Sequence, residues 1–174
     1  MPSRLVFIPP PQAVVVDYVP VNAGIEKVPD PSKNELDGVF VLRAAHEIAE
    51  SIGGHEKFFD KLGRIMDGVK EGGVAIMAEP QYSHSFADQP EIIKSVKDLK
   101  KREIGHSHDP EDYIPYYKMR EKMESYGFEL VEESEVEDKS SLEYLNLQYI
   151  GRKKSPCFFY IQTYRKKPET IEES

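Results

Sequence analysis

The sequence predicts an α/β fold, in which a mostly parallel sheet is flanked by helices and ends in an antiparallel pair of strands. Residues 37–42 and 72–80 each contain an apolar run bounded by glycine and an acidic residue, which is typical of strands buried on both faces. Between them, apolar residues recur three or four positions apart from Phe58 to Val69, which indicates a helix. A strand, a helix and a strand at this spacing form a right-handed βαβ unit. We therefore expect two parallel strands whose carboxyl ends lie side by side, where α/β sheets bind ligands.

Length and composition limit the class of protein. The chain has 174 residues, 39% of them hydrophobic, which suits one domain with its own core. We expect a single α/β domain over residues 1–166, with irregular strands and loop in 1–36, followed by a flexible tail at 167–174. No apolar run approaches the ~20 residues that span a bilayer, so we expect no membrane segment.

The net charge limits the expected binding partners, and the cysteine content indicates the cellular compartment. The net charge of −8 argues against broad binding of a nucleic-acid backbone. The single cysteine, Cys157, excludes an internal disulfide and fits a reducing compartment. The first residues lack the basic segment, apolar stretch and cleavage site of a signal peptide. These features together predict a cytoplasmic protein.

The first 36 residues leave no room for a helical crossover. Residues 5–8 and 13–17 predict short strands, the first apolar and the second apolar up to its closing Asp17, but Pro9, Pro10 and Pro11 stand between them. A parallel pair joined by a helix needs a connection of at least ~10–12 residues. Residues 18–36 contain three prolines and a glycine without a helical period, which predicts a loop.

The middle of the chain alternates helical segments with glycines. A helix is expected from Ala45, interrupted at residues 53–54, and a second from His55 to Lys70. Further on, residues 90–105 predict a helix that begins at a proline and ends at a glycine. Asp109 and Pro110 then resemble the N-cap and first position of a helix that runs to Gly127.

The last third contains the remaining strands. Residues 128–131 alternate as a strand does, whereas residues 132–141 are acidic and expected to be exposed. Residues 142–150 fit either a strand or a helix. Residues 158–164 are rich in aromatic and β-branched residues and predict a strand.

This series of signals resembles the class I S-adenosylmethionine-dependent methyltransferases over about residues 37–166. Residues 35–48 resemble the family's fourth strand and the His-containing segment that often follows it. Residues 62–80 resemble its helix, Gly-Gly turn and fifth strand, with Glu71 where the family usually has proline. The sixth strand and the antiparallel seventh have counterparts at residues 126–131 and 158–165.

The N-terminal part departs from the family pattern. The family binds its cofactor with a glycine-rich turn after the first strand, whereas this chain has Pro9, Pro10 and Pro11 there. Prolines offer no backbone N–H group and no positive φ. Asp17 resembles the acid that ends the second strand and takes the ribose hydroxyls. The resemblance therefore implies a methyltransferase sheet whose N-terminal half is reduced or missing.

The resemblance also implies site residues. His46 and Glu47 would meet the acceptor as catalytic residues; the alternative is that they simply begin a helix. Cofactor contacts would come from Asp17 and from the residues that end the fourth strand, Leu42, Arg43 and Ala44. Acceptor contacts would come from the segment after the fifth strand, Glu79, Tyr82 and His84, although Glu79 also fits an ordinary strand exit.

A metal site is not expected from the spacing of the histidines. His106, His108 and Asp109 fall close together, but Pro110 stands where a metal-hydrolase pattern needs another histidine. An N-cap role explains Asp109 without a metal.

Two functions remain open at this point. One is an S-adenosyl-L-methionine-dependent methyltransferase with an unknown acceptor. The other is a catalytically inactive methyltransferase-like protein that acts as a binding or regulatory subunit, as the prolines at 9–11 suggest. In either case a shortened sheet leaves an exposed edge, so we expect a homodimer or a partner subunit.

Overall fold

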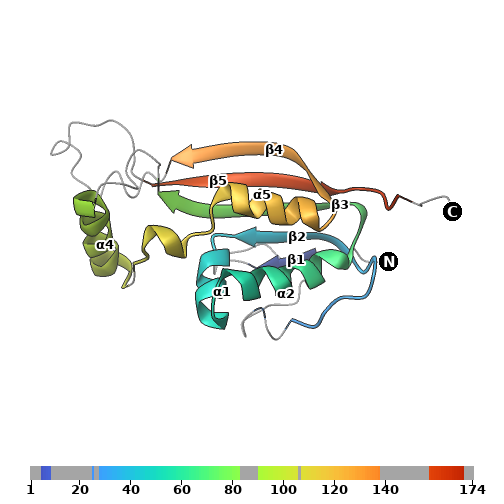
Figure 1. Ribbon diagram of the computed structural model, residues 1–174, viewed down its shortest axis with the longest axis horizontal. Helices are drawn as coiled ribbons and strands as arrows, with labels where there is room; N and C mark the ends of the chain where they lie inside the picture. Colours follow the sequence, from blue (N-terminus) through green and yellow to red (C-terminus); the bar gives the residue numbers. More distant parts are fainter. Residues whose placement is uncertain are drawn as a thin grey trace.

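The computed structural model describes residues 5–8, 25, 28–82, 90–105, 107–137 and 157–170. Within these ranges the chain forms a five-stranded sheet in the order β1-β2-β3-β5-β4 (Figure 1). The strands are β1 (Leu5–Ile8), β2 (Leu36–Leu42), β3 (Val69–Tyr82), β4 (Phe128–Glu137) and β5 (Cys157–Lys166). The expected strand at 13–17, the ambiguous segment at 142–150 and the end of the tail lie outside the described residues.

The α/β class is confirmed, and the sheet is mixed. β1 pairs in parallel with β2, and β2 with β3, whereas β5 runs antiparallel to both β3 and β4. Because two of the four described ladders are antiparallel, the expectation of a mostly parallel sheet is not confirmed. The βαβ prediction is correct: β2 and β3 are joined through helices and stay in register from Gly38↔Val74 to Leu42↔Ala78.

The helices are α1 (Ala45–Ile52), α2 (His55–Asp67), α4 (Pro90–Ile104) and α5 (Tyr116–Ser125), with a short 3-10 helix η2 (Pro110–Asp112). Gly53 separates α1 from α2, as the sequence predicts, because it adopts φ +97°. Its N–H bonds back to α1, which ends that helix. The start and end of α4 also agree with the expected helix.

Three expected boundaries are wrong. α2 ends at Asp67 rather than Lys70, and β3 already begins at Val69, so the Gly-Gly pair lies inside the strand. The ladder between β2 and β3 accommodates it with a shift, from Leu36↔Val69 to Gly38↔Val74. β4 is also longer than predicted, because its pairing with β5 continues through exposed residues to Glu137↔Phe158.

The single helix expected from Asp109 to Gly127 is instead two pieces. Asp109 does cap a helix, but only the three residues of η2 follow it. α5 then starts after Pro115, which is its N-cap residue. Pro115 has no N–H to donate and disfavours a helical conformation at the residue before it, so a continuous helix cannot pass through it.

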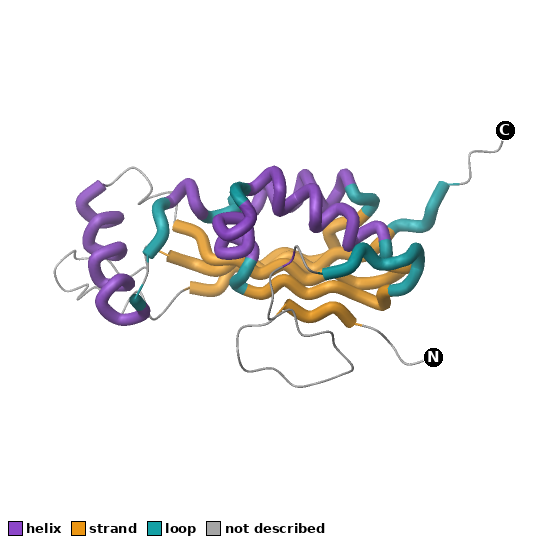
Figure 2. Tube along the Cα trace, turned by 90° about the horizontal axis from the view of Figure 1, so that it is seen from below, coloured by secondary structure: helices purple, strands orange, loops and turns teal. Residues whose placement is uncertain are grey.

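One face of the sheet carries the main core. α1, α2 and α5 lie together on this face (Figures 1 and 2). Alternate strand residues are buried beneath them: Val39, Val41, Ala75, Met77, Tyr160 and Tyr164. They meet an apolar stripe of α2, including Phe58, Leu62 and Ile65, each of which is fully buried. This packing fixes β2, β3 and α1 relative to one another, and with them the site described below. No described helix is long and apolar enough to cross a membrane.

Candidate functional site

β2 and β3 run in the same direction, as the βαβ prediction requires, and the last residue of β2, Leu42, lies beside Ala78, shortly before β3 ends at Tyr82. The backbone N–H of Arg43, just past β2, donates to the carbonyl of Ala78 on β3 at 2.6 Å. Arg43 adopts φ +58°, a left-handed conformation that non-glycine residues rarely adopt and that is often found at ligand sites. The chain turns there and enters α1 at Ala45.

Glu79 connects the two strand ends. Its side chain is fully buried, and its carboxylate accepts hydrogen bonds from the backbone N–H of Ala45 at 2.6 Å and of His46 at 3.4 Å. α1 makes no side-chain cap with its own N-cap residue, Ala44. Glu79 therefore satisfies N–H groups that the helix leaves without an internal partner. Its negative charge interacts favourably with the positive end of the helix dipole.

The same carboxylate fixes the imidazole of His46. His46 Nδ1 lies 2.6 Å from Glu79 Oε2, and His46 is only 5% exposed. An ionised carboxylate only accepts hydrogen bonds, so Nδ1 is the donor when Glu79 is ionised. The other ring nitrogen, Nε2, is then the atom of His46 that is available to accept a proton or bind a ligand.

Aromatic rings surround this histidine. The rings of His108 and Tyr113 lie with centroids 4.8 Å and 5.0 Å from that of His46, and His108 meets it edge-on. Tyr82 packs against Tyr113 at 5.6 Å, and its hydroxyl donates to the carbonyl of His108 at 3.4 Å. Burial raises the pKa of Tyr82 well above its usual value, so its phenol stays neutral at physiological pH.

A third polar side chain completes the group. One donor atom from each of His46, Glu47 and His108 lies within 4.8 Å of the others. His46 is buried, His108 is partly buried and Glu47 is exposed, so the group opens to solvent on the carboxylate side. The sequence singled out His46 and Glu47 because they follow a strand end. It did not pair them with His108, which is 61 positions further along the chain, and no local signal predicts that contact.

The other predicted site residues are divided between two places. Leu42 and Ala44 are partly exposed beside Arg43 at the end of β2, so these three can contact a ligand there. Arg43 also extends its guanidinium over the ring of Phe159 on β5, 4.6 Å from the centroid. Glu79 and Tyr82 are buried, and their contact with substrate stays a prediction. Asp17 and His84 lie outside the described residues.

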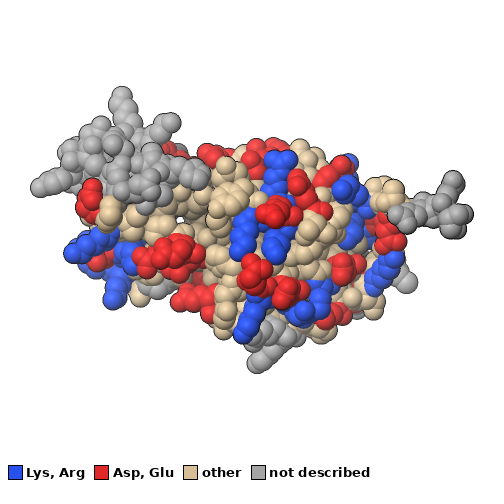
Figure 3. Space-filling view, viewed as in Figure 1, with Lys and Arg blue, Asp and Glu red and all other residues tan. Residues whose placement is uncertain are grey.

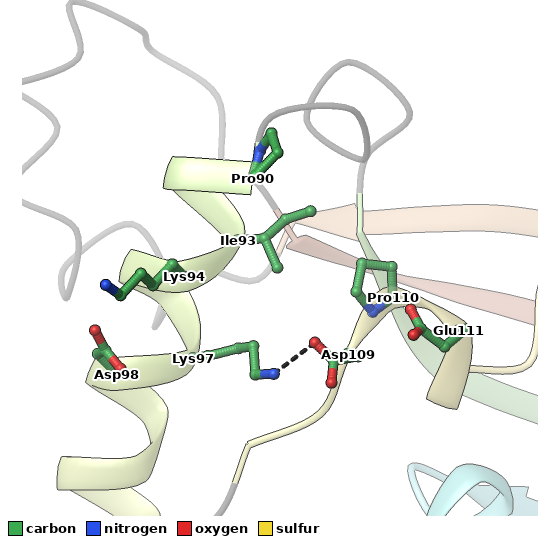
Figure 4. A pocket seen from close by; sticks show the side chains of 8 residues that line it. All are labelled: Pro90, Ile93, Lys94, Lys97, Asp98, Asp109, Pro110 and Glu111. Atoms are coloured by element: carbon green, nitrogen blue, oxygen red, sulfur yellow. Dashed lines mark hydrogen bonds and ion pairs between the residues drawn. The ribbon is translucent and has the colours of Figure 1, made fainter.

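A shallow cavity of about 530 Å³ lies between α4 and the segment that follows His108 (Figure 4). Lys97 of α4 points toward Asp109, and the ion pair between them spans the gap at 2.5 Å, whereas Lys94 points away from Asp109. The sequence did not predict this cavity. It adjoins the histidine group through the backbone of residues 108–109.

Charges are mixed on the face that carries the helices. Basic and acidic side chains alternate there, with no extended patch of one sign on the face shown (Figure 3). One such group joins α2 to α5, where Glu56 contacts Lys118 at 2.9 Å and Lys122 at 3.3 Å. These cations hold the pKa of Glu56 below its usual value.

Comparisons with known proteins show which solved structures this architecture resembles. No protein-family model matches the chain, and no curated protein sequence matches it either. Among solved structures, a candidate methyltransferase from Bacillus halodurans matches 96% of this chain and 92% of its own, at 16% identity and a TM-score of 0.56. An S-adenosylmethionine-dependent methyltransferase from Methanosarcina mazei covers 87% of this chain and 68% of its own, at 9% identity and a TM-score of 0.53. The chain has a class I methyltransferase-like fold.

The same fold includes proteins named for other reactions. The [4+2]-cyclase SpnF matches 88% of this chain at 15% identity with a TM-score of 0.51, and this chain spans only 56% of its length. The sequence resemblance likened residues 158–165 to the antiparallel seventh strand of the methyltransferases. β5 contains these residues and is antiparallel to both its neighbours, which agrees with that resemblance. At these identities the likeness concerns fold, and function has to be argued from the site.

Proposed function

We propose that the protein is an S-adenosyl-L-methionine-dependent methyltransferase whose acceptor meets the methyl donor beside His46. The observation that carries this proposal is the buried Glu79–His46 pair at the adjoining ends of β2 and β3. It lies where α/β sheets bind ligands, and it holds one imidazole in one orientation and one tautomer. The methyltransferase-like fold supplies the reaction class.

The proposed reaction needs little from the protein beyond alignment. A nucleophilic atom of the acceptor attacks the methyl carbon, the carbon–sulfur bond breaks, and S-adenosyl-L-homocysteine leaves. An acceptor that carries a proton on that atom must lose it. Most of the acceleration in such an in-line displacement comes from holding the two reactants together. His46 either orients the acceptor or takes its proton through Nε2.

The described end of β2 is compatible with the cofactor. Leu42, Arg43 and Ala44 would line it, since they are at least partly exposed at the strand end and Arg43 already holds a conformation typical of ligand contacts. Asp17 would bind the ribose hydroxyls, as the resemblance implies. When bound, the cofactor would supply an electrophilic methyl group.

The second function is a methyltransferase-like binding or regulatory module without methyl transfer. It is favoured by Pro9, Pro10 and Pro11, which stand where the family has its glycine-rich turn. The fold of SpnF also shows that a likeness of this kind is compatible with a different named reaction.

Calorimetric titration with S-adenosyl-L-methionine and S-adenosyl-L-homocysteine distinguishes the two functions. The methyltransferase should bind both, and Asp17→Asn should weaken binding by about tenfold or more, because it removes hydrogen bonds to a charged group. Asp67→Asn, an exposed residue at the end of α2, is the matched control and should bind as the unaltered chain does. No heat with either ligand at about 1 mM would eliminate the enzyme and leave the binding module.

A further inference from the structure

We propose that His46, Glu47 and His108 form a binding site for one divalent first-row transition metal ion. The three side chains come from α1 and from the segment before η2, and their donor atoms lie within 4.8 Å of one another. Two imidazole nitrogens and one carboxylate oxygen are a donor set that suits Zn²⁺, Fe²⁺ or Co²⁺ better than Mg²⁺ or Ca²⁺, which prefer oxygen.

The carboxylates beside the two histidines support a ligand role. Metal-binding histidines usually donate their other ring N–H to a carboxylate, which fixes the tautomer and makes the ligand nitrogen more basic. His46 meets this condition through Glu79, at 2.6 Å from Nδ1 to Oε2. The Nδ1 atom of His108 also faces a carboxylate, at an ion-pair distance of 3.6 Å from Oε2 of the exposed Glu50, which is longer than a hydrogen bond. The hydrogen bond to Glu79 therefore leaves Nε2 of His46 for a metal, and Glu50 favours the same arrangement for His108.

The three donor atoms must move closer together to bind one ion. Ligands held at about 2.0–2.2 Å from a tetrahedral ion lie about 3.3–3.6 Å apart. The widest separation in the group, within 4.8 Å, must therefore shrink by about 1.2–1.5 Å, and the exposed side chain of Glu47 at the start of α1 can rotate toward the histidines. Tyr113 packs against both histidine rings, at 5.0 Å and 5.7 Å, and keeps them close without a metal.

Three protein ligands leave at least one coordination position open. Structural zinc sites are closed by four protein ligands, whereas catalytic sites keep a position for water or substrate. The exposed side of this group, at Glu47, is where that position would face solvent. If the proposed methyl transfer also holds, the metal would bind an oxygen atom of the acceptor there, and His46 would orient the acceptor as a ligand rather than act as its base. The metal site itself does not depend on methyl transfer.

The test uses the full chain, freed of metal with a chelator and titrated with Co²⁺ and Zn²⁺ in the absence of any nucleoside. We expect one ion per chain, with visible Co²⁺ absorption that Zn²⁺ abolishes. Glu47→Gln and His108→Gln should each weaken binding by about tenfold or more. Glu47 is exposed, so its variant should keep the fold, which thermal denaturation verifies.

Matched controls separate this site from other sources of metal binding. His55→Gln and Glu121→Gln alter a histidine and an exposed glutamate outside the group, and neither should change the affinity. Two histidines as close in sequence as His106 and His108 can chelate a metal even in an unfolded chain. His106→Gln tests for this, and it should leave the metal affinity unchanged. Binding that depends on His106 but not on Glu47, or no stoichiometric binding of either ion, would overturn the proposal. Because no cofactor is present, these results stand whether or not S-adenosyl-L-methionine binds.

Discussion

At the residue scale, Glu79 both caps a helix and orients a histidine of the candidate site. Its buried carboxylate accepts hydrogen bonds from the start of α1 and from the ring of His46, so one side chain joins β3, α1 and the candidate site. A buried carboxylate is costly unless such donors surround it. Its position therefore makes both the stability of α1 and the orientation of His46 depend on its charge.

Glu79→Gln should lower the free energy of unfolding by about 2 kcal/mol, because hydrogen bonds to a charged acceptor are lost and the new amide N–H₂ faces donors. Urea denaturation followed by circular dichroism measures this. Glu121→Gln replaces an exposed glutamate on α5 in the same way and should change stability by less than about 0.5 kcal/mol. Equal stabilities of the two variants would contradict the role assigned to Glu79.

Sequence reasoning recovered this site only in part. His46 and Glu47 could be found because they follow β2, and Glu79 because it lies near the end of β3, the neighbouring parallel strand. His108 could not, since it joins the group through the path of the chain from α4 to η2. The buried role of Glu79 was also missed, because a glutamate before a proline is equally typical of an exposed strand exit.

At the element scale, the glycine pair inside β3 shows two different requirements for glycine. Gly72 has φ +73° and open space around its Cα. Gly73 has no room: a Cβ there would lie 2.5 Å from a methyl carbon of Val69 and 2.9 Å from the carbonyl oxygen of Asp37. Gly72 is needed for its backbone conformation and Gly73 for its close approach to β2.

Different substitutions should therefore be tolerated at the two positions. Gly73→Ala should lower the free energy of unfolding by about 1–3 kcal/mol, because the backbone of the β2–β3 ladder must shift. Gly72→Asn should cost less, since asparagine adopts left-handed conformations more readily than most residues. Urea midpoints of the two variants give the comparison. A Gly73→Ala variant as stable as Gly72→Asn would refute the steric account.

The elements themselves were mostly predictable, and the exceptions have local causes. The βαβ unit and α4 followed from periodicity and from proline or glycine at their ends. The helix expected from Asp109 failed because Pro115 interrupts it while the apolar spacing continues on either side. α2 ends early because the apolar spacing that suggested a longer helix passes into Val69, which β3 uses as a buried strand residue.

At the scale of the whole molecule, the two edges of the described sheet differ. β4 carries five exposed glutamates, Glu129, Glu132, Glu133, Glu135 and Glu137, which repel a second copy and discourage strand pairing. β1 is apolar in sequence and forms the opposite edge. The homodimer or partner subunit expected from an exposed edge stays a prediction, and it points to the β1 side of the sheet.

Stability should fall in alkaline solution, because buried tyrosines are spread over the whole fold. Burial is the main cause that raises the pKa of Tyr82, Tyr126, Tyr160 and Tyr164 above 10.0. Below pH 10 these phenols are neutral in both the folded and the unfolded chain, so their contribution to stability is fully present. Above pH 10 the unfolded chain releases their protons while the folded chain retains them, so stability is lost as pH rises toward the folded pKa values.

Urea midpoints measured from pH 8 to pH 11 should therefore stay level up to about pH 10 and then fall. Tyr160→Phe removes one of the buried phenols, whose hydroxyl donates to the carbonyl of Ile114 at 2.8 Å. This variant should lower the free energy of unfolding by about 1 kcal/mol at neutral pH. Above pH 10 its stability should fall less steeply with pH, because unfolding then releases up to one proton fewer. Tyr117→Phe is the matched control, because Tyr117 is 58% exposed and should leave the decline unchanged. A decline that is equally steep in both variants would mean that burial of Tyr160 does not hold its proton in the folded chain.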